Sequence, residues 1–383
     1  YRLAADSSAH AQARLGKLLA SKPGASPAER REAAQLLEQA LAAGEASSLM
    51  PLAALYLNYP QNFPAVNLPQ RIGQWRQAGY PQAELVQIGY YRAQGSYAEH
   101  LGEIERICRQ ALSQADVCYE ELASVYQMRR PSDEQAAAQL DALLEQLLAA
   151  YQAKTVPAQR VEGVAQVLAD AELGTPDENR ARQLLEQIAP AYPAAWVSLA
   201  RLLYDYPGLG DVEQLLEYLE HGRAAALPRA ELLLGKLYYE GKLVAQDPKK
   251  AEAHLLKAVD SELSAHYYLG LLYARGYLGR IAPDKALRHL LRAARGGQSH
   301  ADFALAQWFA EGRGIQVNRV NAYVFSQLAL RKDNPQASAL AQEIQLQLLP
   351  AQRSQAERLL NEERQLRASA GQNAAQLQAM HTR

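Results

Sequence analysis

The chain has 383 residues, enough for two or three ordinary domains or for one long array of repeats. Lys and Arg together number 40 and Asp and Glu 41, so the net charge of −1 gives no support to a nucleic-acid partner. No run of about 18 apolar residues occurs, so we expect no transmembrane segment. The 21 Tyr and only four Phe favour many partly hydrated helix contacts over one large core.

A short anchor recurs along the whole chain: a large apolar residue, then Gly or Ala, then another apolar residue two positions on. Nine copies begin, in chain order, at Leu15, Leu52, Ile88, Leu122, Val164, Leu199, Leu234, Leu269 and Leu305. A tenth begins at Leu340, and successive copies are 34 to 42 residues apart. This period is typical of a solenoid of helix pairs.

Local signals predict where the helices of each pair begin and end. Helix starts are predicted at hydroxyl or aspartate caps, several followed by Pro. These caps are Ser26, Thr175, Asp247 and Asp284. The first helix of a pair is expected to stop at a glycine with a positive φ angle. These glycines are Gly241, Gly276, Gly312 and Gly314.

The predicted fold class is all-α: a right-handed α-solenoid of helix pairs with an extended concave surface. Residues 1–333 are predicted to form nine repeats. Residues 334–383 are predicted to form a terminal half-repeat, capping helices that close the array, and a polar, weakly ordered tail after about Ser369.

Three C-terminal repeats carry a family pattern in "LGKLYYEGK…DPKKAEAHLLKA", "LGLLYARGYLG…PDKALRHLLRAARGG" and "LAQWFAEGRG…NRVNAYVFSQLA". The pattern resembles tetratricopeptide repeats, and more specifically the Sel1-like subclass, most clearly over residues 229–330. In the third repeat Asn318 and Asn321 stand where the subclass usually has Asp and Lys. The match is weaker before Leu199.

The array as a whole is similar to a family of scaffold lipoproteins that serve bacterial alginate secretion. The similarity rests on "YYLGLLYARGYLG", "SHADFALAQWFAEGRG…NAYVFSQLA" and the following "LPAQR". It implies a periplasmic protein anchored to the inner leaflet of the outer membrane by a lipid on an N-terminal Cys. That Cys is absent here; the sequence starts at Tyr1, so we expect a missing start segment. The implied partners are the outer-membrane alginate porin and the periplasmic alginate-modifying enzyme of the acetylation machinery.

Catalytic constellations are weak, so we expect no enzyme activity, no cofactor and no metal. His254 and His289 occupy the same place in adjacent repeats, and packing or a surface role is favoured over metal binding. The glycine segments 297–301 and 312–317 have no predicted strand before them, so a nucleophile elbow and a phosphate loop are both disfavoured.

The best candidates for binding a partner are first-helix residues expected on the concave surface. Tyr and Arg are enriched at interaction hot spots. The candidate set is Arg229, Lys236, Tyr239, Glu240, Tyr267, Arg275, Phe303, Gln307 and Glu311. Separately, Cys108 and Cys118 lie on either side of a turn near Ser113, where antiparallel helices would bring them level. They are expected to form a disulfide or to stay as two buried thiols, with neither state favoured.

Three hypotheses about function stay open at this point. The first is a protein-binding scaffold in polysaccharide secretion, and the second is a generic Sel1-like adaptor in another envelope or cytosolic pathway. The third is a protein that binds or modifies carbohydrate. The lack of a paired-acid site disfavours modification, whereas the tyrosines leave weak polymer contact open.

Overall fold

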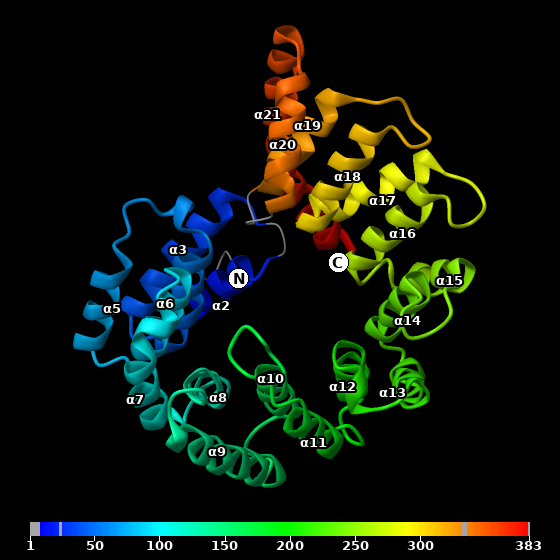
Figure 1. Cartoon of the computed structure of the whole chain (residues 1–383). Helices are drawn as coiled ribbons and strands as arrows, with labels where there is room; N and C mark the ends of the chain where they lie inside the picture. Colours follow the sequence, from blue (N-terminus) through cyan, green and yellow to red (C-terminus); the bar gives the residue numbers. More distant parts are fainter. Residues whose placement is uncertain (1–7, 23–24, 331–334, 382–383) are drawn as a thin grey trace. The chain divides into compact units, whose positions relative to one another are not determined.

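The computed structural model describes residues 8–22, 25–330 and 335–381, and their side chains except at 299, 335 and 368–381. Helices, joined by turns and short 3₁₀ segments, make up the architecture, and no strand occurs within these described ranges (Figure 1). The expected all-α solenoid of helix pairs is confirmed. Two compact units divide the chain: one holds residues up to Pro176 and from Ala368, the other Asp177–Arg367.

The helices of the first unit have the following bounds: α2 Ala9–Ala20, α3 Pro27–Ala42, α4 Leu49–Asn58, α5 Leu68–Gln77, α6 Gln82–Ala93, α7 Leu101–Ala111, α8 Cys118–Arg129, α9 Glu134–Gln152 and α10 Ala158–Leu168. Short 3₁₀ helices lie between some of them: η1 Ala46–Ser48, η2 Pro60–Asn62 and η3 Tyr97–His100. The longest step between anchors, from Leu122 to Val164, is explained by α9, which has 19 residues.

The second unit contains α11 Glu178–Ile188, α12 Ala194–Asp205, η4 Pro207–Leu209, α13 Val212–Ala224, α14 Pro228–Glu240, α15 Pro248–Ala258, α16 Leu263–Arg275, α17 Pro283–Arg295, α18 Ser299–Glu311, α19 Arg319–Ala329 and α20 Pro335–Gln347. The last helix, α21, begins in this unit and runs over Pro350–His381, so its backbone is helical through most of the expected tail. The first helices of successive repeats, from α12 through α14, α16 and α18 to α20, contact one another in order. This contact gives the unit one continuous face of first helices. The proposed division at 333/334 and the hand of the superhelix stay predictions.

The predicted helix starts are confirmed in two cases and wrong in two. Ser26 and Glu29 form a reciprocal capping box, and the Asp247 carboxylate accepts hydrogen bonds from the backbone of the first turn of α15. Thr175 is not a cap, because α11 starts later and Asp177 accepts the capping hydrogen bond instead. Asp284 lies inside the first turn of α17, after Pro283.

Glycine is required at two kinds of position in the Sel1-like repeats. The helix-ending glycines Gly241, Gly276 and Gly312 have φ angles of 67°, 71° and 69°, as expected for left-handed residues. The anchor glycines bring the two helices of a pair together: a Cβ on Gly235 would lie 2.6 Å from Leu255 Cγ. Close approach, rather than helix propensity, therefore explains the anchor.

Ion pairs attach α21 to the preceding repeats within the second unit. Arg295 donates two hydrogen bonds to the Glu363 carboxylate, at 3.0 and 2.8 Å. Arg367 donates to both carboxylate oxygens of Asp302, at 3.1 and 2.6 Å. No helix of the described part is long and apolar enough to span a membrane.

Candidate functional site

The nine predicted partner-binding residues all lie on first helices of the second unit. Arg229, Lys236, Tyr239 and Glu240 are on α14; Tyr267 and Arg275 are on α16; Phe303, Gln307 and Glu311 are on α18. These three helices contact one another in order, so the residues lie along one row of first helices. The exposed members are Arg229, Arg275, Gln307 and Glu311, whereas Lys236, Glu240, Tyr267 and Phe303 are partly buried.

Tyr239 was expected to be exposed, and this prediction is wrong. Only 6% of its surface is accessible, because the rings of Tyr268 and Tyr277 pack against it at centroid distances of 5.6 and 5.8 Å. Its hydroxyl is buried without a hydrogen-bond partner among the described residues, and burial raises the pKa of that phenol. Tyr239 therefore supports the surface from below.

At the α12–α14 end of the face, the charged side chains already contact neighbouring residues of the chain. Glu240 accepts a hydrogen bond from the Tyr204 hydroxyl and forms an ion pair with Lys242 at 3.0 Å. The ammonium of Lys236 lies over the Tyr204 ring, 4.1 Å from its centroid. These charged groups already have partners, so a ligand would have to displace existing contacts.

The α16–α18 end contains a cavity of about 340 Å³, which we call the Arg275 pocket. Its lining comprises Leu271, Ala274, Arg275, Tyr277, Leu290, Ala304, Gln307, Trp308, Glu311 and Arg313. The Arg275 guanidinium lies 5.9 and 6.0 Å from the ring centroids of Tyr239 and Tyr277. No carboxylate of the described residues forms an ion pair with it, although Nη1 donates a 3.4 Å hydrogen bond to Tyr277.

The candidate set missed three residues that shape this pocket: Tyr277, Trp308 and Arg313. Trp308 donates its indole N–H to the Arg313 carbonyl at 2.9 Å, which fixes the turn after α18. Tyr277 and Arg313 each follow the helix-ending glycine of their repeat. That shared position was visible in the repeat alignment, but only the fold shows that the turn lies next to the first-helix face.

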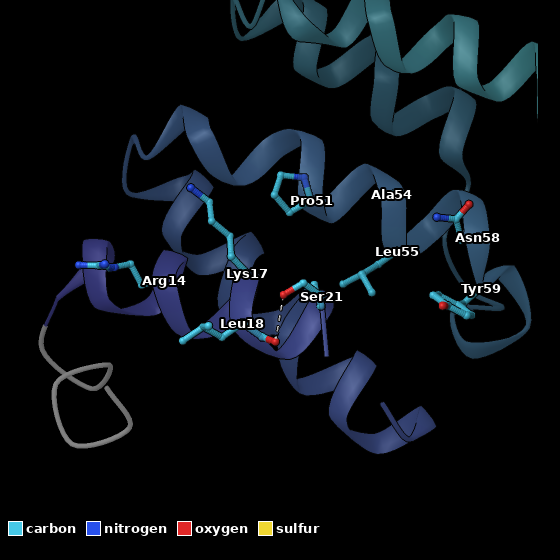
Figure 2. Close-up of a pocket in the computed structure, with 10 residues that line it drawn as sticks. Arg14, Lys17, Leu18, Ser21, Pro51, Ala54, Leu55, Asn58 and Tyr59 are labelled. Carbon is cyan, nitrogen blue, oxygen red and sulfur yellow. Dashed lines mark hydrogen bonds between the residues drawn. The ribbon is translucent and has the colours of Figure 1, made fainter. Parts of the chain in front are cut away.

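A second cavity, of about 640 Å³, lies between α2 and α4 of the first unit (Figure 2). Leu18, Pro51, Ala54, Leu55 and Tyr59 supply most of its apolar lining, and Leu18 is 55% exposed. Arg14, Lys17, Ser21, Asn58 and Ala20 complete the lining, which contains no acidic residue. Nothing in the sequence pattern had marked this pocket.

The cysteines and histidines lie outside these pockets. Cys108 on α7 and Cys118 at the start of α8 are both buried free thiols. A hydrogen bond with Cys118, and then burial, raises the pKa of Cys108. His254 contacts Glu231 at 2.6 Å, and His289 contacts His266 at 2.8 Å, each reaching the first helix of its own repeat. Among described residues, no group of three or more potential ligands could hold a metal.

Two family models match the chain. The AlgK tetratricopeptide repeat domain matches residues 100–189, and the Sel1 repeat matches residues 9–45, 228–262, 263–298 and 299–334. The match at 9–45 extends the Sel1-like pattern into a region where the sequence resemblance was weaker. A solved Sel1 repeat protein from Oxalobacter formigenes is 21% identical, with a TM-score of 0.42 over 54% of this chain and 88% of its own. At that TM-score the fold assignment depends on the chain's own helices.

Curated relatives match along nearly the whole sequence. The alginate biosynthesis protein AlgK of Pseudomonas syringae pv. tomato is 58% identical, over 99% of this chain and 80% of the relative. AlgK of Pseudomonas aeruginosa is 60% identical over 96% and 77%, and AlgK of Azotobacter vinelandii is 51% identical over 99% and 82%. With such identity and coverage, the chain belongs to the AlgK family of alginate biosynthesis proteins.

Proposed function

We propose that the chain is a non-catalytic scaffold of alginate secretion. It holds the periplasmic alginate-modifying enzyme of the acetylation machinery on its Sel1-like repeats and links that enzyme to the outer-membrane porin. It works in the periplasm, tethered by an N-terminal lipid to the inner leaflet of the outer membrane. The observation that carries the proposal is the 51–60% identity to AlgK proteins along nearly the whole chain.

The face of α14, α16 and α18 is the surface we assign to the enzyme. It combines exposed Arg229 with partly exposed Tyr267, whose ring packs at 5.3 Å against that of Tyr268. Aromatic and arginine side chains held by their neighbours bind partners with little loss of conformational entropy. The net charge of −1 argues for docking by shape and a few anchors rather than by long-range attraction.

The test is binding of the purified modifying enzyme to the full chain and to the double variant Arg229→Ala/Tyr267→Ala. Tyr239 is kept, because it is buried and its loss would disturb packing. We expect binding about tenfold weaker or worse, as for hot-spot residues. Leu256→Ala is the matched control, since Leu256 is exposed on the second helix α15.

Undiminished enzyme binding by the double variant would exclude this surface as the docking site. No enzyme binding by the unaltered chain would overturn the scaffold role. The location is tested by fractionating cells that express the natural precursor: recovery outside the outer-membrane fraction would contradict the tether.

A further inference from the structure

The Arg275 pocket combines the groups needed to bind an acidic sugar. Arg275 and Arg313 are its basic residues and Glu311 is its one acidic residue, so the lining carries one net positive charge. The Glu311 carboxylate is already paired with Arg313 at 2.8 Å. Arg275 is thus the cation left for a ligand, because no carboxylate of the described residues pairs with it.

Arg275 lies near two aromatic rings before any ligand arrives. Its guanidinium is 5.9 and 6.0 Å from the ring centroids of Tyr239 and Tyr277, and it donates a 3.4 Å hydrogen bond to the Tyr277 hydroxyl. A planar guanidinium can bind a carboxylate with two parallel hydrogen bonds.

The remaining lining suits a ring with one apolar face and polar edges. Tyr277 is 40% exposed, so aromatic surface is present beside the charge, whereas Trp308, also part of the lining, is only 6% exposed. Gln307 is exposed in the same pocket and offers an amide donor and acceptor. The lining therefore mixes polar and apolar groups in similar measure, which suits a ligand that is polar at its edges.

We propose that the Arg275 pocket binds a uronate unit of the secreted polysaccharide, with the sugar carboxylate on Arg275, the ring against Tyr277, and a hydroxyl on Gln307. The inference rests on the proposed function, because the chain must lie along the path of the polymer. Alginate fits, because each of its rings carries a carboxylate and hydroxyls. The scaffold would then guide polymer as well as hold protein.

The experiment is a calorimetric titration of the full chain with a short oligomannuronate at low salt. We expect saturable binding that weakens about tenfold in Arg275→Ala, the usual scale for a lost charge-assisted hydrogen bond. Gln307→Ala should weaken binding less, and it serves as a second variant if Arg275→Ala disturbs folding. Arg280→Ala is the matched control, since Arg280 is exposed outside the pocket lining.

Two further ligands distinguish a uronate site from a site for neutral sugars or for acidic peptides. A neutral cello-oligosaccharide should not bind, because it lacks the carboxylate. Poly-L-glutamate binding as tightly, with the same dependence on Arg275, would overturn the proposal in favour of an acidic peptide site. Absence of saturable oligomannuronate binding would also overturn it.

Failure of this inference and failure of the scaffold proposal can be told apart. Enzyme binding is measured with the Arg229→Ala/Tyr267→Ala variant, whose residues do not line the Arg275 pocket. Loss of oligomannuronate binding in Arg275→Ala with enzyme binding retained supports the polymer site. Loss of enzyme binding in Arg275→Ala without an effect on oligomannuronate would make the pocket a protein-docking site instead.

Discussion

Arg367 and Asp302, 65 residues apart in sequence, form a two-pronged ion pair that attaches α21 to α18. Asp302 is only 4% exposed, and Glu363, the other carboxylate that Arg367 contacts, is 7% exposed. Buried carboxylates depend on their cations, because water cannot replace them. The C-terminal helix is therefore attached by charge as well as by apolar packing.

Replacing Arg367 with Ala should lower the free energy of unfolding by about 3–5 kcal/mol, as for a broken buried ion pair. The paired variant Arg367→Met/Asp302→Leu should lose less, since it removes the buried charge of Asp302 together with that of Arg367. Urea denaturation measures both. An Arg367→Ala variant as stable as the unaltered chain would contradict the attachment role.

Glu363 should make stability fall in acid. Burial raises the pKa of its carboxyl, but hydrogen bonds from Arg295 and Arg367 outweigh burial and hold the pKa below its ordinary value of 4.5. The folded state therefore binds fewer protons than the unfolded state. The ionised Glu363 contributes its full stabilising free energy above about pH 4.5, and this stabilisation is lost as the pH falls through the lowered pKa of the folded state. Denaturation curves from pH 6 downward should show a shallower decline for Glu363→Gln; identical slopes would exclude the effect.

The pair His266 and His289 should also lower the stability of the fold as the pH falls, but over a higher pH range than Glu363 does. Burial, ahead of repulsion by neighbouring cations, lowers the pKa of both rings, to about 4 for His289. Their nitrogens, 2.8 Å apart, allow one shared proton, so stability present above about pH 6.5 should be lost between that pH and about 4.

The preceding repeat offers a matched test of this pair. Glu231 and His254 occupy the positions 35 residues before His266 and His289, and there a carboxylate faces the imidazole at 2.6 Å. His266→Glu should reproduce that pair, so that protonation of His289 becomes favourable and the loss of stability between pH 6.5 and 5 disappears. Persistence of the loss in this variant would show that other groups cause it.

The anchor glycines Gly235 and Gly270 of the Sel1-like repeats should tolerate no side chain. A Cβ on Gly270 would lie 2.5 Å from Leu290 Cγ, so Gly270→Ala should cost about 1–3 kcal/mol by overpacking. Gly73 on α5 is the control, because a Cβ there meets nothing within 4 Å and Gly73→Ala should stabilise by up to about 1 kcal/mol. Hydrogen exchange should show the Gly270→Ala damage in the neighbouring repeats; uniform loss along the chain would contradict nearest-neighbour stability.

Cys108 and Cys118, which are free thiols in the structure, can form a disulfide when the protein is made in an oxidising compartment. Both thiols are buried, and their mutual hydrogen bond raises the pKa of Cys108. The short loop that they close would add roughly 2–3 kcal/mol. Thiol counting on unreduced, denatured protein decides the state, and two reactive thiols would refute the bond.

The repeat period, the helix pairs and the left-handed glycines could be read from the sequence, because each depends on local spacing or on backbone sterics. The helix starts could not all be read in this way. At the start of α11 the Asp177 carboxylate lies nearer to the first-turn N–H groups than Thr175 does, and it accepts the capping hydrogen bond. The alternation of first and second helices was sufficient to place all nine candidate residues on first helices.

Side-chain exposure on that face was decided only by tertiary structure. Tyr239 has the spacing of a surface residue, yet Tyr268 and Tyr277 of the next repeat cover it. The same packing brings Arg275 over two rings and places Trp308 and Arg313 beside it. A periodic sequence predicts which residues fall on the first helices, but the contacts between repeats determine which side chains remain open to a ligand, because contacts such as those of Tyr239 with Tyr268 and Tyr277 join residues 29 and 38 positions apart.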